Sequence, residues 1–217
     1  PPHFFLMQRP PPTSTRKDSS ASADVYKRQK LVNMNKKVLL TGISGYIGLH
    51  CAKVLLEKGY NVVGSVRSSD KENDVKKTLN SASVDIKNLS FAHLDLNSDN
   101  GWDVASSNCD YVMHIASPFT VENPKIEADM LGPAIDGTLR VLKAAKKNMV
   151  KRVVLTSSTV AIMGGKKNGT ISPEDWTDLN SKNISTYFKS KTLAEKAAWD
   201  FVDNQSLDHP LELVSIN

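Results

Sequence analysis

From Lys37 onward, short apolar runs rich in β-branched residues alternate with longer stretches of helical periodicity. The runs predict six strands, at residues 37–41, 61–66, 89–94, 111–116, 152–158 and 211–216. The stretches between them predict helices at 47–58, 72–80, 133–148 and 187–203, with a weaker one at 101–107. Strands and helices that alternate in this way form a parallel sheet with right-handed crossovers. The predicted fold class is therefore α/β, a doubly wound parallel sheet of the Rossmann type, which binds ligands beyond the carboxyl ends of its strands. The remaining long stretch, 159–186, predicts a functional loop.

The first 33 residues do not share this pattern. They contain half of the prolines, a serine cluster and no apolar periodicity, which predicts disorder. Met34 stands directly before "NKKVLLTG", which opens the first apolar run, so we expect residues 1–33 to be a non-native leader and residues 34–217 to form the folded domain. A targeting peptide is the alternative, although the prolines interrupt any amphipathic helix.

Composition and charge narrow the function classes. The 217 residues carry a net charge of +5, but residues 1–33 alone hold six basic and two acidic side chains. The rest is nearly neutral, with 22 basic and 21 acidic side chains, which disfavours a nucleic-acid partner. No apolar run approaches the roughly 18 residues of a membrane span, so a soluble, cytoplasmic protein is expected. The two cysteines, Cys51 and Cys109, have no histidines at ligand spacing, which predicts reduced, buried thiols and no metal site.

The segment "TGISGYIG", residues 41–48, places three glycines in the turn from the first strand to the first helix. A helix start directs free backbone N–H groups at one point, and glycines let a phosphate approach them. We expect Gly42, Gly45 and Gly48, with Tyr46 and Ile47 between them, to hold the pyrophosphate of a dinucleotide. Glycines that serve only the backbone of a tight turn are the alternative.

The end of the second strand indicates which dinucleotide is bound. Arg67 occupies the position where an NAD-binding domain usually has an acid for the ribose 2′-hydroxyl. Arg67 and Lys71, with the hydroxyls of Ser68 and Ser69 beside them, suit a 2′-phosphate, so NADP(H) is favoured over NAD(H). A solvated basic loop is the alternative reading.

The end of the third strand supplies Asp95 and Leu96, which we expect to receive the adenine. Asp95 would accept a hydrogen bond from the adenine amino group. A strand-end aspartate is also common as a cap, which remains open here. His114, inside the fourth strand, is interpreted as a packed core histidine and not as a base.

A second group of polar residues points to chemistry at the same edge of the sheet. Tyr187 and Lys191 stand four apart at the start of a helical pattern and therefore share one face. The fifth strand ends in "TSS", which brings Ser157 and Ser158 to the same carboxyl-end crevice. An exposed tyrosine and lysine at this spacing also occur by chance.

Taken together, these segments resemble the extended short-chain dehydrogenases, in the branch of dihydroflavonol, cinnamoyl-CoA and methylglyoxal reductases. The matching segments are "TGISGYIG", "VRSSDK", "LDL", "HIASPF", "AIDGTLRVLKAA", "VVLTSS" and "YFKSKTLAEKAAW". The resemblance implies that Tyr187 is the proton donor, that Lys191 holds the nicotinamide ribose and that Ser158 orients the substrate carbonyl. It also implies that Ala116 and Ser117 line the cofactor.

The implied activity is NADPH-dependent reduction of a small-molecule aldehyde or ketone by a monomer or homodimer. A nucleotide-sugar epimerase or dehydratase of the same fold and a non-catalytic NADP-binding sensor are the alternatives. Two departures limit the resemblance. Asp136 stands where many members have asparagine, and the sequence stops at "LVSIN", where the family continues into a substrate lobe, so a truncated domain is expected.

Overall fold

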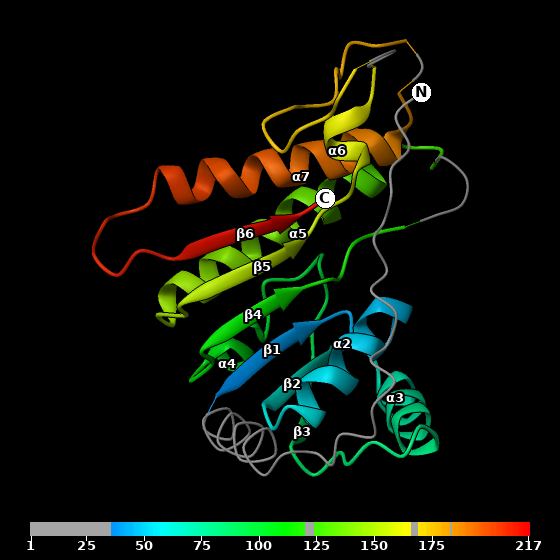
Figure 1. The fold of residues 1–217 in the computed structure, drawn as a ribbon, viewed down its shortest axis with the longest axis vertical. Helices are drawn as coiled ribbons and strands as arrows, with labels where there is room; N and C mark the ends of the chain where they lie inside the picture. The colour runs from blue at the N-terminus through cyan, green and yellow to red at the C-terminus, as the bar shows by residue number, and fades with distance from the viewer. Residues whose placement is uncertain (1–35, 120–123, 166–168, 183) are drawn as a thin grey trace, which may run out of the picture.

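The computed structural model describes residues 36–119, 124–165, 169–182 and 184–217. Its strands form one parallel sheet in the order β3-β2-β1-β4-β5-β6, which confirms the predicted doubly wound topology (Figure 1). The strands are β1 (Lys37–Thr41), β2 (Asn61–Val66), β3 (Leu89–His93), β4 (Tyr111–His114), β5 (Arg152–Thr156) and β6 (Glu212–Ile216). The order reverses between β1 and β4, so the crevice beyond their carboxyl ends is the expected ligand site. The proposed leader, residues 1–33, lies outside the described residues.

The helices alternate with the strands as the periodicity predicts. They are α2 (Tyr46–Glu57), α3 (Ser69–Ser81), α4 (Trp102–Ser106), α5 (Ala128–Lys147), α6 (Val160–Met163) and α7 (Thr186–Asp203). Ser68 and Ser185 cap α3 and α7, because their side chains accept from the backbone N–H of Lys71 and Phe188. These caps fix where the two helices begin.

Two helix predictions were wrong in detail. Helix α5 begins at Ala128, five residues before the predicted start at Pro133. Proline is common at the first helical position, but here it lies inside the helix. The stretch 159–186 also contains the short helix α6, where we expected only a loop.

Strands β4 and β5 end two residues earlier than predicted, at His114 and Thr156. After β4 the backbone leaves the sheet because the N–H groups of Ile115 and Ala116 donate to the Thr41 hydroxyl, at 3.0 and 3.1 Å. The apolar pattern continues through these residues, but their hydrogen bonds no longer belong to the sheet.

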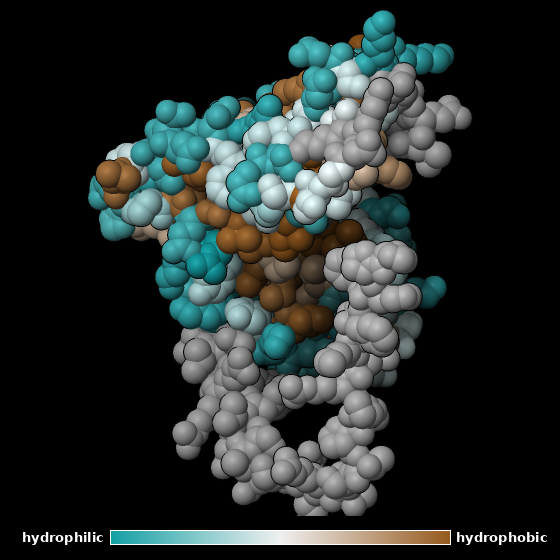
Figure 2. Space-filling view, turned by 45° about the horizontal axis from the view of Figure 1, so that its top comes forward, coloured by the Kyte–Doolittle hydropathy of each residue, from teal (hydrophilic) through white to brown (hydrophobic). Residues whose placement is uncertain are grey.

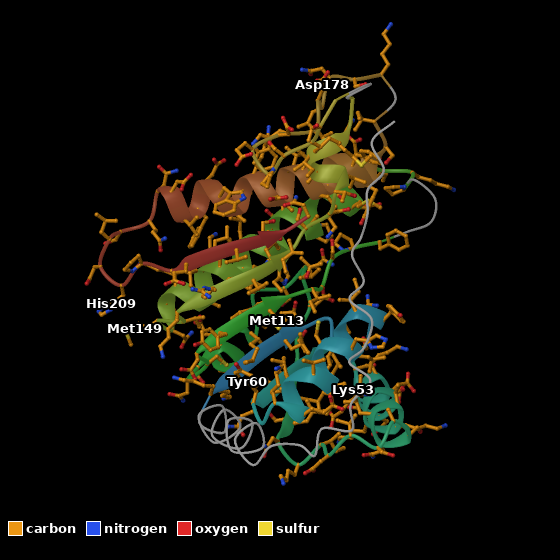
Figure 3. All side chains as sticks on the ribbon, viewed as in Figure 1. Lys53, Tyr60, Met113, Met149, Asp178 and His209 are labelled. Atoms are coloured by element: carbon orange, nitrogen blue, oxygen red, sulfur yellow. The ribbon has the colours of Figure 1, made fainter. Side chains whose placement is uncertain are left out.

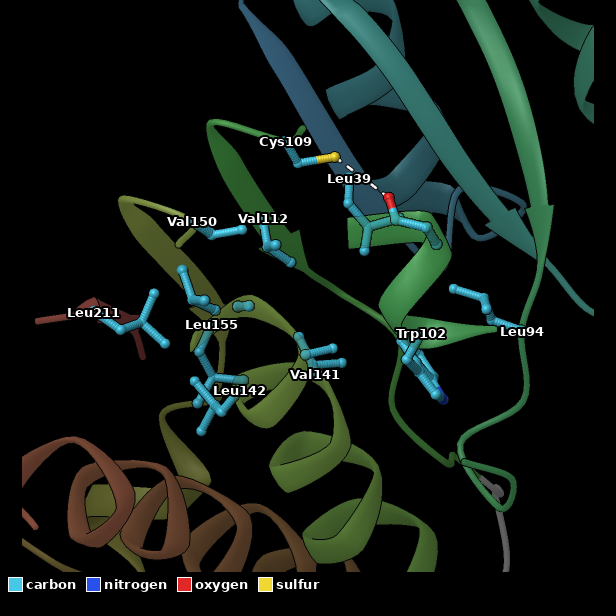
Figure 4. Close-up of a cluster of buried hydrophobic side chains, with 14 of the residues drawn as sticks. Leu39, Leu94, Trp102, Cys109, Val112, Val141, Leu142, Val150, Leu155 and Leu211 are labelled. Atoms are coloured by element: carbon cyan, nitrogen blue, oxygen red, sulfur yellow. Dashed lines mark hydrogen bonds between the residues drawn. The ribbon is translucent and has the colours of Figure 1, made fainter. Parts of the chain in front are cut away.

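The core has two layers, one on each face of the sheet. On one face, α4, α5 and α7 cover side chains that include Leu39, Val112, Val153 and Leu155 (Figure 4). On the other face, α2 and α3 cover Leu40, Val62 and Val66. Successive side chains of a strand point to opposite faces, so each strand contributes to both layers.

The second face is apolar beyond the helices that cover it. Met113, Val154 and Val214 lie side by side in the register of β4, β5 and β6, and Ile216 follows two residues after Val214. Val214 is 40% exposed and Ile216 is 54% exposed. Figure 2 shows hydrophobic side chains gathered over this part of the sheet. Among the described residues, no helix packs over β5 and β6 on this face.

The cysteines only partly match the expectation. Both thiols are free, and Cys109 is buried, but Cys51 is half-buried. Burial raises the pKa of both thiols, which favours the protonated form. Within the described ranges, no helix is long and apolar enough to cross a membrane.

Candidate active site

The predicted site residues lie at the carboxyl ends of the parallel strands. The opposite edge of the sheet is marked in Figure 3 by Met149 and His209, which precede β5 and β6. The glycine turn follows β1, Arg67 follows β2, and Ala116 follows β4. Because the strands are parallel, segments far apart in sequence share this edge.

The three glycines of the turn have different structural roles. Gly42 has φ +69°, and a Cβ there would lie 2.8 Å from the backbone nitrogen of Ala116. A Cβ on Gly48 would lie 2.1 Å from the carbonyl oxygen of Gly42. Both positions require glycine for the backbone itself, as the alternative reading of the turn proposes.

Gly45 differs from its neighbours. It has extended backbone angles at the N-cap of α2, and a Cβ would meet only the Gly42 oxygen, at 3.4 Å. No side chain in the described part of the chain caps this helix start. The first N–H groups of α2 are therefore available to an anion, and Gly45 leaves space in front of them.

Thr41 joins the glycine turn to the end of β4, a role that the sequence did not reveal. Its side chain is fully buried, and its hydroxyl accepts from the backbone N–H of Ile115 and of Ala116. The same oxygen lies 2.8 Å from Nδ1 of His114. With two donors already on the oxygen, its proton is directed at Nδ1, which then acts as the acceptor. Thr41 thereby places Ala116 against the glycine turn.

His114 is confirmed as a buried core residue, 2% exposed. Burial, together with the nearby Lys191 charge, lowers its pKa to about 3. Its Nε2 lies 3.5 Å from the Thr138 hydroxyl, so both ring nitrogens have polar neighbours. A neutral imidazole held in this way orients the backbone and does not exchange protons near neutral pH.

The basic residues after β2 are accessible. Arg67 is exposed and forms no ion pair or hydrogen bond with another described residue. Lys71 pairs with Asp74 at 3.1 Å, with both side chains more than half exposed. Ser68 is occupied as the cap of α3. Unlike Lys71, Arg67 can therefore bind an anion without first breaking an ion pair with a described residue.

The residues after β3 are only partly directed at the crevice. Asp95 accepts from the backbone N–H of Asn97 at 2.8 Å, which is a local turn, as the capping alternative proposes. The Leu96 side chain packs on α5, where a Cβ on Gly137 would lie 2.8 Å from it. Gly137 was not singled out in the sequence, although it allows this close approach.

Helix α7 carries the predicted catalytic pair in its first two turns. Lys191 is 7% exposed, and its ammonium donates to the carbonyl oxygen of Thr156 at 3.1 Å. Burial lowers the pKa of Lys191 to about 8, while the charge of Glu195 raises it. The Tyr187 ring meets Phe119 edge to face, with centroids 5.5 Å apart. Lys191 therefore ties α7 to the end of β5, and Phe119 supports the tyrosine from the segment after β4.

Ser158 follows Ser157 at the end of β5. The Ser158 hydroxyl is partly exposed and accepts from the Val160 backbone N–H at a long 3.4 Å. Ser157 is buried and donates to Glu195 at 2.5 Å. Asp136, the departure noted above, lies exposed on α5. In the part of the chain that the structure describes, no cluster of residues could hold a metal ion.

Known proteins resemble this chain over most of its length. Residues 38–209 match the NAD dependent epimerase/dehydratase family. A dihydroflavonol 4-reductase from Arabidopsis thaliana is 37% identical over 186 residues, covering 82% of this chain and 48% of the relative. A putative NADPH-dependent methylglyoxal reductase from Candida albicans is 34% identical over 195 residues, covering 82% of this chain and 57% of the relative.

The fold has the same relatives. A crystal structure of Gre2 from Candida albicans in complex with NADPH superimposes with a TM-score of 0.72 at 32% identity, covering 84% of this chain and 57% of that one. The chain thus spans about half the length of the relatives that it matches. On the sequence match and the shared fold, the chain belongs to the NAD dependent epimerase/dehydratase family.

Proposed function

We propose that this protein is an NADPH-dependent carbonyl reductase that converts an aldehyde or ketone to an alcohol. The observation that carries the proposal is the arrangement on α7, where Tyr187 and Lys191 lie one turn apart and Lys191 reaches the end of β5. The relatives named as methylglyoxal and dihydroflavonol reductases point to the same reaction class. The substrate is accordingly a small molecule with a reducible carbonyl.

The residues present fit NADPH. Gly45 opens the start of α2 to a pyrophosphate, and Gly42 and Ala116 meet behind it. Arg67 is exposed and can pair with a 2′-phosphate, for which a guanidinium fork is well shaped. Ser117 follows Ala116 in the segment after β4, which leads to Phe119 beside Tyr187. Asp95 and Leu96 follow β3, where the adenine would bind. Lys191 has one hydrogen-bond partner among the described residues, the Thr156 carbonyl, and an ammonium has two further donors for ribose hydroxyls.

The chemistry explains why these residue types are needed. NADPH, when bound, supplies the hydride. The substrate oxygen gains negative charge as the reaction proceeds, and the Tyr187 hydroxyl donates the proton that neutralises it. A cation one turn away favours the phenolate that is left behind. Ser158 donates a hydrogen bond to the same substrate oxygen, as an oxyanion hole does.

Two alternatives use the same fold. A nucleotide-sugar epimerase or dehydratase would use the same tyrosine and lysine but usually retains NAD, and the exposed Arg67 disfavours it. A non-catalytic NADP-binding sensor would not need a tyrosine, a lysine and a serine together at the carboxyl ends of the strands. Both alternatives predict NADP(H) or NAD(H) binding without net reduction of a simple carbonyl.

The test compares cofactor affinity with turnover in the Tyr187→Phe variant. The change removes one hydroxyl and keeps the ring that packs on Phe119, so NADPH affinity by fluorescence stays within about twofold. Turnover on a panel of aldehydes and ketones, methylglyoxal among them, falls roughly 10²- to 10⁴-fold, the usual contribution of general acid catalysis. Tyr60→Phe is the matched control, since Tyr60 precedes β2 at the opposite edge of the sheet (Figure 3). Undiminished turnover in Tyr187→Phe would remove this residue from the mechanism.

A further inference from the structure

Glu195 is a buried acid that the proposed reaction does not use. It lies on α7 one turn after Lys191 and is 4% exposed. Its carboxylate accepts three hydrogen bonds, from the Ser157 hydroxyl at 2.5 Å, the Asn217 amide at 2.7 Å and the Trp199 indole at 3.3 Å. All three partners donate, which is the arrangement that an ionised carboxylate accepts. Burying a carboxylate is costly, so a structural purpose is expected of it.

Two of the partners of Glu195 lie at the ends of different strands, and the third, Trp199, is on α7 itself. Ser157 directly precedes Ser158 at the end of β5, and Asn217 follows β6. The Asn217 amide also lies 3.4 Å from the Ser158 carbonyl oxygen, which it approaches as a donor. Through these contacts, one carboxylate holds the ends of two neighbouring strands against the helix that carries Tyr187.

Glu195 stands four residues after Lys191, the other buried charged residue of the site, so the two share one face of α7. Lys191 is nearly as buried, and its ammonium contacts a neutral carbonyl, that of Thr156. Within the described residues, the groups coupled electrostatically to Lys191 are Glu195 from α7 and His114 from β4, and Tyr187 lies one turn before it on its own helix. Among the described residues, Glu195 is the group that raises the Lys191 pKa against the effect of burial.

We propose that Glu195 is a positioning residue with two linked tasks: it fixes Ser157, and through it Ser158, against α7, and it supplies the counter-charge for the Lys191 ammonium. The proposal rests on the proposed function for its catalytic meaning, because Ser158, Tyr187 and Lys191 are the groups that it aligns. Its electrostatic part concerns the protein alone and can be measured without substrate.

The electrostatic part is tested by following the titration of Lys191 through the ¹³Cε resonance of ¹³C-lysine-labelled protein, assigned with Lys191→Arg. In the unchanged protein we expect the midpoint at about 8, the pKa that burial gives Lys191. Glu195→Gln keeps the shape of the side chain but removes its charge, so the Lys191 midpoint falls by at least about 0.5 pH unit. Glu195→Asp restores a carboxylate and brings the midpoint back toward that of the unchanged protein. The control is Asp200→Asn, which removes an exposed acid from the same helix and leaves the midpoint unchanged.

The positioning part is tested with Ser157→Ala, which keeps the Glu195 charge and deletes the contact to β5. Its Lys191 midpoint stays unchanged, NADPH affinity changes less than about twofold, and carbonyl turnover falls on the order of tenfold. A Lys191 midpoint that is equal in Glu195→Gln and the unchanged protein overturns the counter-charge, and full turnover in Ser157→Ala overturns the positioning role. If Glu195→Gln does not fold, Glu195→Met, which also lacks the charge, replaces it in the Lys191 titration, and Ser157→Ala still tests the positioning role.

These outcomes separate this inference from the proposed function. If Glu195→Gln does not lower the Lys191 midpoint but Tyr187→Phe still loses turnover, only the role of Glu195 is refuted. If Glu195→Gln lowers the Lys191 midpoint but the unchanged protein reduces no carbonyl, the counter-charge stands and the proposed reductase function is refuted.

Discussion

The glycine turn offers the sharpest prediction, because the structure assigns its three glycines different roles. The relevant changes are Gly48→Ala and Gly45→Ala, with Gly132→Ala as the control. Gly132 lies in α5, and a Cβ there would meet no described atom within 4 Å outside its own helix turn. Each variant adds one methyl group, so the differences between them report only on where that group is placed.

At Gly48 the methyl would lie 2.1 Å from the Gly42 carbonyl oxygen, more than 1 Å inside ordinary contact. Neither atom is on a flexible side chain, so α2 or the turn itself must move. We expect a loss near the upper end of overpacking effects, about 3 kcal/mol. For a chain of this size that corresponds to a fall in Tm of roughly 6–12 °C.

At Gly45 the methyl is compatible with the backbone, which has φ −82° and ψ 165°. Replacing glycine by alanine at a compatible position stabilises a protein by about 0.4–1 kcal/mol, but alanine is a poorer N-cap than glycine by a similar amount, so Tm changes little. The methyl occupies the space in front of the α2 N–H groups, where the pyrophosphate would bind. Hydrogen bonds to charged groups contribute about 1.5–3 kcal/mol, so loss of one weakens NADPH binding tenfold or more.

The assays are thermal unfolding by circular dichroism without cofactor and NADPH titration by fluorescence. Gly48→Ala is expected to lose stability, Gly45→Ala to lose NADPH affinity alone, and Gly132→Ala to lose neither. Unchanged NADPH affinity in Gly45→Ala would refute the phosphate cradle and leave the turn as a backbone feature. An unchanged Tm in Gly48→Ala would refute the close approach of α2 to the turn.

Arg67→Asp is expected to reverse the cofactor preference from NADPH to NADH, because it replaces the cation for a 2′-phosphate with an acceptor for a 2′-hydroxyl. Catalytic efficiencies with both cofactors measure the preference. Equal efficiencies in the unchanged protein would contradict the role of Arg67. His114 makes stability fall in acid: its folded pKa of about 3 lies below the usual 6.5, so the unfolded chain binds more protons between these values, and stability is lost as pH falls through that window. The loss attributable to His114 is about 2 kcal/mol at pH 5. In His114→Asn, the free energy of unfolding in urea should therefore differ less between pH 7 and pH 5 than in the unchanged protein. An equal difference in the two proteins would show that His114 is not the group responsible.

Much of the fold was accessible from local sequence. Strand and helix patterns such as those of β1, β2 and α2 are periodic over a few residues, and their alternation restricts the topology to a doubly wound sheet. The same argument predicted that the glycine turn, Arg67 and Ser158 would share one edge. The spacing of Tyr187 and Lys191 placed both on one face of a helix, whatever the rest of the chain does.

Boundaries were less accessible, since they depend on partners that are distant in sequence. The start of α5 before Pro133 and the early end of β4 could not be predicted from periodicity. In the second case, the Thr41 hydroxyl takes the backbone N–H groups that would have continued the sheet.

The sequence alone therefore determined which residue types meet at the carboxyl edge, and the tertiary structure decided how they are held there. Glu195 appears in the sequence as one of several acids on an amphipathic helix. Only the packing of α7 against the ends of β5 and β6 buries it beside Ser157 and Asn217. Phe119 likewise meets Tyr187 only because the segment after β4 runs past the start of α7. Burial and hydrogen bonding between distant segments are properties of the folded chain, and they give a lysine on a helix a pKa of about 8 and a histidine in a strand a pKa of about 3.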